Sequence, residues 1–188
     1  MADNEHSIAT YLSDMLALER HIRVPFETQL KDEDFSKFSS AKPLLQRLVD
    51  LNQTHIDSLS TALDILGGHE ASPIKSTVST IEGFFAGVID MMRKTKVSKA
   101  LRDDYTALSL CTAGYTMLTA TANAMGHADV ATIAQRHLGD YAQRVIEIAQ
   151  ILPVVVVEEL RATGLRVETG TIPQSVNSTQ ETWSGAAR

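Results

Sequence analysis

The sequence predicts an all-α protein, and three observations carry this prediction. Only 5% of the 188 residues are aromatic, which is low for a protein built on sheets. Apolar residues recur at spacings of three and four over long stretches, which is the period of an amphipathic helix. Glycine and proline stand where several of these stretches begin or end. A chain of this length can bury about 70% of its unfolded surface in a single core, so we expect one main domain.

The first two predicted helices are separated by a polar connection. The first covers residues 7–30, and Pro25 is expected to bend its last turns. The second starts near Ser40, carries Pro43 in its first turn and stops at the glycine pair 67–68. We expect these two helices to form one hairpin.

Three further helices are expected after the glycine pair. The third carries an apolar stripe within residues 78–92 and should lie across or beside the others. The fourth covers residues 99–124 and ends at Gly126. The fifth runs from about residue 128 past residue 152, where Pro153 either kinks or ends it. The fourth and fifth helices should form a second hairpin.

The C-terminal segment differs from the rest in composition. Residues 165–188 are rich in Thr, Ser, Gln and Gly and show no helical period, so the chain divides into a helical domain at 1–164 and a tail at 165–188. Apolar residues scattered in a polar segment suggest an arm that docks on a partner subunit, and a disordered tail is the open alternative. These apolar residues are Val167, Ile172, Val176 and Trp183.

Composition excludes several classes of function. A net charge of -6 argues against a nucleic-acid partner and against binding to an anionic membrane. No apolar run is long enough to cross a bilayer. The single cysteine cannot form an internal disulfide, and the first residues do not resemble a secretory signal, so a cytoplasmic location is expected. No phosphate-binding loop, nucleophile elbow or Cys-x-x-Cys pair is present. The sequence therefore leaves enzymatic activity uncertain and favours a protein that is not an enzyme.

Polar residues stand on the apolar stripes of the first two helices. Glu19 lies in the middle of a stripe that runs through Leu12, Met15, Ile22 and Phe26. The second helix puts Asn52 and His55 on its own stripe. An unpaired buried charge costs several kcal/mol, so Glu19 needs either a hydrogen-bonding partner or a metal ion.

Five sequence segments, in this order and spacing, resemble the YciE/YciF-like branch of the ferritin superfamily over residues 11–160. The segments are MLALERHI, ALDILGG, STIEGFFAGVIDMM, AGYTMLTATANAMG and IAQRHLGDYAQRV. The resemblance implies a ferritin-like four-helix bundle with one additional helix, here followed by the polar C-terminal tail. It also implies a carboxylate-rich dimetal centre and a stress-related role.

The family's ligand pattern is only partly present. Glu19 matches the carboxylate of the first helix, and the Glu-x-x-His motif of the second becomes Asn52-x-x-His55. The expected glutamates of the fourth helix fall at Leu108 and Cys111. A dimetal centre needs about four carboxylates and two imidazoles. We therefore expect the dimetal centre to be lost.

On the fifth helix the family's inward glutamate corresponds to Tyr141. Asp140 stands one step to the side and is expected to face elsewhere. His137 is expected on a solvated face, as is Asp104 near the start of the fourth helix.

These residues predict a buried, metal-free cluster of Glu19, Asn52, His55, Cys111 and Tyr141. A charge-assisted Glu19 to His55 hydrogen bond would satisfy both groups without an ion, and replacing Glu19 with leucine should then cost little. The alternative is a single iron or manganese ion held by Glu19 and His55 and completed by Tyr141, Cys111 or Asp140.

We expect a non-catalytic, stress-associated structural or interaction protein with no cofactor, assembled as a homodimer or larger homo-oligomer. The alternative is a metal-binding oxidoreductase or iron-handling protein with a reduced ligand set. Fold analogy alone supports the alternative.

Overall fold

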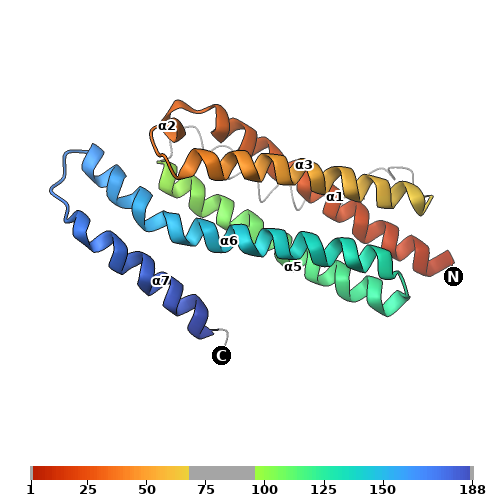
Figure 1. Cartoon of the computed structure of the whole chain (residues 1–188). Coiled ribbons are helices and arrows are strands. Elements are labelled where there is room, and N and C mark those ends of the chain that lie inside the picture. Colours follow the sequence, from red (N-terminus) through yellow and green to blue (C-terminus); the bar gives the residue numbers. More distant parts are fainter. Residues whose placement is uncertain (1, 68–95, 187–188) are drawn as a thin grey trace.

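The computed structural model describes residues 2–67 and 96–186, and over these residues every regular element is a helix (Figure 1). This confirms the all-α prediction for the described part of the chain. The predicted stripe at residues 78–92 lies outside the described residues. The elements are α1 (Ala2–Lys31), α2 (Glu33–Ser36), α3 (Ala41–Ile65), α5 (Val97–Met125), α6 (Ala128–Ala162), the 3-10 helix η1 (Thr169–Thr171) and α7 (Ile172–Ala186).

Four long helices pack side by side around a common interior (Figure 1). Helix α1 contacts α3 and α5, and α6 contacts α5 and α3, so each long helix has two long neighbours. The two expected hairpins, α1 with α3 and α5 with α6, are both present. None of the described helices contains an 18-residue window apolar enough to span a bilayer. Among the largest fully buried side chains are Tyr115, Tyr141, Phe26, Ile8, Leu12 and Ile22.

Glycine ends two of the long helices where the sequence predicts it. Gly67 and Gly126 have φ values of +69° and +81°, a left-handed conformation that favours glycine. Proline does not end the helices that contain it, because Pro25 lies inside α1 and Pro153 lies inside α6. Helix α6 therefore continues to Ala162, and its C-terminal half is available for further packing.

The C-terminal segment is helical, so the prediction that it lacks a helical period is wrong. Ile172, Val176, Thr179 and Trp183 follow spacings of four, three and four, which puts them on one face of α7. The first three are half-buried, and α7 packs on α6. Serine and threonine are tolerated because their hydroxyls donate back to the preceding turn, as at Ser175, Ser178, Thr179, Thr182 and Ser184.

A buried polar contact joins α1 to α5 near one end of the bundle. Gln29 Nε2 donates to Asp104 Oδ1 at 2.8 Å, and both side chains are buried. The expectation that Asp104 lies in solvent is wrong, because its position falls on the inward stripe with Ala100, Leu101 and Leu108. Burial raises the pKa of Asp104 to about 8, and the negative charge of Asp103 adds to this shift while the Gln29 hydrogen bond opposes it.

This raised pKa makes the stability of the fold depend on pH. An aspartate in the unfolded chain loses its proton near pH 4, whereas folded Asp104 keeps it to about pH 8, so the native state is disfavoured progressively over that interval. In the native protein, the free energy of unfolding falls as the pH rises over this interval, with a limiting slope of about 1.4 kcal/mol per pH unit. We expect Asp104→Asn to make this fall shallower. Urea unfolding at several pH values measures this. Equal slopes for the native protein and the variant would contradict it.

Candidate functional site: a buried carboxylate cluster

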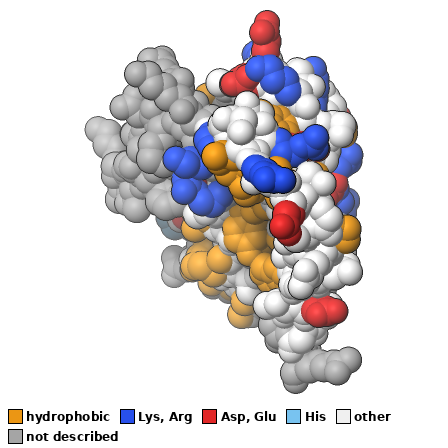
Figure 2. All heavy atoms as spheres, turned by 90° about the vertical axis from the view of Figure 1, so that its left-hand side faces the viewer, with side chains coloured by type: hydrophobic (Ala, Val, Ile, Leu, Met, Phe, Trp, Pro, Cys, Tyr) orange, Lys and Arg blue, Asp and Glu red, His pale blue; other side chains and the backbone are white. Residues whose placement is uncertain are grey.

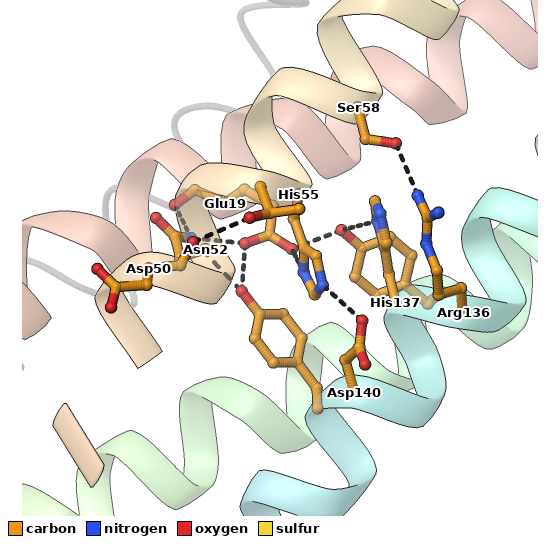
Figure 3. Close-up of polar contacts among 11 residues, drawn as sticks. Glu19, Asp50, Asn52, His55, Ser58, Arg136, His137 and Asp140 are labelled. Atoms are coloured by element: carbon orange, nitrogen blue, oxygen red, sulfur yellow. Dashed lines mark hydrogen bonds and ion pairs between the residues drawn. The ribbon is translucent and has the colours of Figure 1, made fainter. Parts of the chain in front are cut away.

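Glu19 lies at the centre of the interior and receives hydrogen bonds from three other helices (Figure 3). Tyr115 on α5 donates to Oε1 at 2.5 Å, and Nδ1 of His55 on α3 lies 3.1 Å from the same oxygen. Asn52 on α3 donates to Oε2 at 2.6 Å, and the hydroxyl of Tyr141 on α6 donates there too. The side chain is fully buried, so these donors replace its hydration shell.

Asn52 is suited to this position because it donates. Its Nδ2 contacts the Glu19 side chain and also lies 2.9 Å from the Glu19 carbonyl oxygen, which ties α3 to the backbone of α1. A glutamate at this position would bring a second negative charge against Glu19 and supply no donor in its ionised form. Asparagine at this position therefore matches a carboxylate satisfied by hydrogen bonds.

The two tyrosines act as permanent donors. Burial and the nearby charge of Glu19 raise the pKa of both Tyr115 and Tyr141, so both phenols keep their protons. Tyr141 was predicted in the cluster. Tyr115 is not among the residues that the sequence predicts for the cluster. A polar tip on an otherwise apolar stripe is the signal that could have identified it.

His137 is buried inside the cluster, so the expectation of a solvated face is wrong. Its ring stacks on His55 at a centroid separation of 3.8 Å, with 15° between the planes. The inward stripe of α6 passes through Ala134 and Tyr141, and position 137 lies three and four residues from these, on the same face. Burial, then the neighbouring His55 and Arg136, lower the pKa of His137 to about 3, so the ring is neutral.

The hydrogen-bond network assigns the tautomer of His137. Nδ1 lies 3.1 Å from the Tyr115 hydroxyl, whose own proton goes to Glu19. The neutral ring therefore donates from Nδ1, and its Nε2 carries a lone pair. That Nε2 and Asn52 Oδ1 are buried atoms without a hydrogen-bond partner in the described part of the chain.

Asp140 connects the cluster to the surface. Its Oδ2 lies 3.2 Å from His55 Nε2, and its side chain is 39% exposed. The expectation that Asp140 faces elsewhere is wrong, because its carboxylate contacts the His55 ring although the residue stands one position before Tyr141 on α6. The His55 ring therefore links the buried Glu19 to the partly exposed Asp140. Asp140 opens onto a surface hollow of about 290 Å³ that Arg47 and Arg144 also line.

Cys111 lies in the same interior and is fully buried. Burial and the charge of Glu19 raise the pKa of its thiol, so the thiol stays protonated and unreactive. The structure thus brings Glu19, Asn52, His55 and Tyr141 into direct contact, and Leu108 is buried as an apolar residue.

The residues do not fit a dimetal centre. Two cations held in a protein interior need several carboxylates to bridge and neutralise them. Here Glu19 is the carboxylate at the centre of the cluster, and its oxygens already accept from four donors. Over residues 2–67 and 96–186, no group of three or more His, Cys, Asp or Glu side chains is arranged to hold a metal ion.

The fold and the cluster together define an all-α protein with a hydrogen-bonded carboxylate at the centre of its helices. The sequence matches no family model and no curated protein. The structure is similar to a crystal structure of a protein from Xanthomonas campestris pv. campestris, with a TM-score of 0.71 and 17% sequence identity. The match covers 86% of this chain and 99% of that protein, and at this identity it establishes a shared fold alone.

The contacts of Glu19 change the expected cost of removing it. Glu19→Leu would remove the carboxylate that contacts Tyr115, Tyr141 and His55, and would leave Asn52 with the Glu19 carbonyl oxygen. We therefore expect the free energy of unfolding to fall by about 3 to 5 kcal/mol, above the mild effect that a two-residue pair implies. Glu19→Gln keeps one acceptor oxygen and should cost less than leucine. Urea unfolding measures both, with Glu147→Gln as a control that alters contacts to two arginines outside the cluster. A leucine variant within about 1 kcal/mol of native would contradict the role of Glu19.

The neutral state of His137 can be observed directly. Because its pKa is lowered to about 3, we expect its ring resonances in an NMR titration to stay unshifted from about pH 8 down to about pH 4. A protonation shift of His137 near neutral pH would show that the ring is solvated or differently paired.

Proposed function

We propose that this protein is a ferritin-like, non-catalytic structural or interaction protein, in which a hydrogen-bonded cluster takes the place of a dimetal centre. One observation carries the proposal: both oxygens of Glu19 accept from donors on other helices, two tyrosine hydroxyls among them. In a metal centre, these carboxylate oxygens would bind the ion, whereas here they accept hydrogen bonds. A carboxylate satisfied in this way needs no ion.

The cluster suits a scaffold. Donors from α3, α5 and α6 converge on one side chain of α1, so a register shift of any long helix would leave buried polar groups unpaired. Such a network favours one arrangement of the helices over near alternatives, which is the best attested use of buried polar groups. The sequence resemblance supports a stress-associated role. The single cysteine supports a location in the cytoplasm. We further propose that the protein assembles as a homo-oligomer.

A second candidate is a protein that holds one iron or manganese ion with a reduced ligand set. The lone pairs of His137 Nε2 and Asn52 Oδ1, which have no described partner, favour this alternative. A neutral imidazole nitrogen and an amide oxygen are both competent ligands. This candidate would need Glu19 to give up at least one of its present donors.

Metal analysis of untagged protein separates the two candidates. We expect substoichiometric iron and manganese by mass spectrometry, and a melting temperature that is unaffected by a chelator or by added Fe(II) or Mn(II). The reason is that a bound ion stabilises the native state by mass action, whereas the cluster needs none. Light scattering on the same sample gives the oligomeric state.

The variant His137→Phe is the matched control for this experiment. It removes the ring nitrogens and keeps an aromatic side chain of similar size, so in a metal-free protein it should leave the metal content unchanged. Near-stoichiometric metal that disappears in His137→Phe would overturn the proposal and establish the second candidate.

A further inference from the structure

Helices α5, α6 and α7 line a shallow, open surface groove of about 620 Å³ on the outside of the bundle. Its floor is a stripe on α6 formed by Ala149, Leu152, Pro153 and Val156. Tyr105 on α5 and Trp183 on α7 flank this stripe, with their ring centroids 6.4 Å apart. The volume falls within the range of small-molecule sites.

The floor of the groove is a second apolar face of α6. Val145, Ile148 and Val155 on the same helix are buried in the bundle core. The groove stripe has spacings of three, one and three, which defines a neighbouring face of the helix. Ala149 is buried and Leu152 packs against the core at the edge of this face, whereas Val156 is exposed. Helix α7 covers this face incompletely, since Val156 stays 40% exposed and Trp183 43% exposed. Apolar surface is thus left to water beside an aromatic pair.

The charge around the groove is opposite to that of the whole chain. Lys99 and Arg102 line it and no acidic residue does, although the chain has a net charge of -6. Arg102 pairs with Asp103 at 2.7 Å, whereas Lys99 makes no ion pair with a described residue. Glu159 already accepts the backbone N–H and hydroxyl of Ser98, so it is committed to the first turn of α5. On the end of the molecule drawn in Figure 2, hydrophobic side chains form a patch bordered by Lys and Arg side chains.

We propose that this groove binds a small amphiphile with a linear apolar chain and an anionic head group. The chain lies along the α6 stripe against the Trp183 indole, and the head group meets the Lys99 ammonium at the rim. Apolar contact supplies the affinity, and the positive charge of Lys99 selects the sign of the head group. The inference stands independently of whether the interior cluster binds metal.

Trp183 is the protein's only tryptophan, so its fluorescence reports directly on the groove. We expect decanoate, added below its micelle-forming concentration to the full-length protein, to give a saturable blue shift of the emission as the indole loses water. Decyltrimethylammonium has the same chain with a cationic head group and should bind at least about tenfold more weakly.

Two exposed substitutions test the contributions of the head-group and chain contacts separately. Lys99→Glu reverses the rim charge and should weaken decanoate binding by about tenfold or more. Val156→Asp places a charge on the floor and should remove binding. Lys31→Glu makes the same charge change at the end of α1, outside the groove lining, and should bind as the native protein does. Circular dichroism confirms that all three variants are folded.

Four outcomes would overturn the proposal. The first is equal affinity for the two amphiphiles, and the second is binding by Lys99→Glu as tight as that by Lys31→Glu. The third is an emission change confined to concentrations at which decanoate forms micelles. In the fourth outcome, Trp183 emission without amphiphile depends on protein concentration, which would show that a second copy of the chain occupies the groove.

Discussion

The arrangement of the long helices depends on the burial of one carboxylate. Glu19 has no exposed surface, and a charge in that position is tolerated only if surrounding groups replace its lost hydration. The structure provides donors from α3, α5 and α6, so all four long helices meet at this side chain. The apolar core supplies most of the driving force for folding, but apolar contacts alone tolerate small shifts between helices. The four-donor contact does not, and it therefore fixes the helices in one register.

This constraint explains the residue types around Glu19. Asn52 must donate, which a carboxylate could not do, and the tyrosine hydroxyls must stay protonated, which burial and the charge of Glu19 ensure. His137 completes the network as a neutral ring that donates to Tyr115. In a dimetal centre, cations neutralise several carboxylates. Here hydrogen-bond donors satisfy a single carboxylate, so the donor side chains around Glu19 take the part that cations take in such a centre.

The sequence predicts the helices and the centre of the cluster because both follow from one period. Glu19, Asn52, His55 and Tyr141 all stand on inward stripes, and these positions meet wherever the stripes pack together. His137 and Asp140 are misplaced because the prediction takes the inward face of α6 as the single row through Tyr141, and a helical face is wider than a single row. Helix α7 was missed because its serines and threonines have low helix propensity when their side-chain bonds to the preceding turn are ignored.

Helix α6 serves both the interior and the surface groove, at different places along its length. His137 and Tyr141 join the cluster from the first half of the helix, whereas the groove stripe begins at Ala149, two turns beyond Tyr141. The cluster holds the first half through hydrogen bonds to α1 and α5. The second half is held by apolar contacts, by the ion pair of Glu147 with Arg47, and by Ser98, whose N–H and hydroxyl donate to Glu159. A ligand in the groove would thus contact a part of α6 whose position does not determine that of Glu19, so the chain can keep its interior fixed while its outer surface binds and releases a partner.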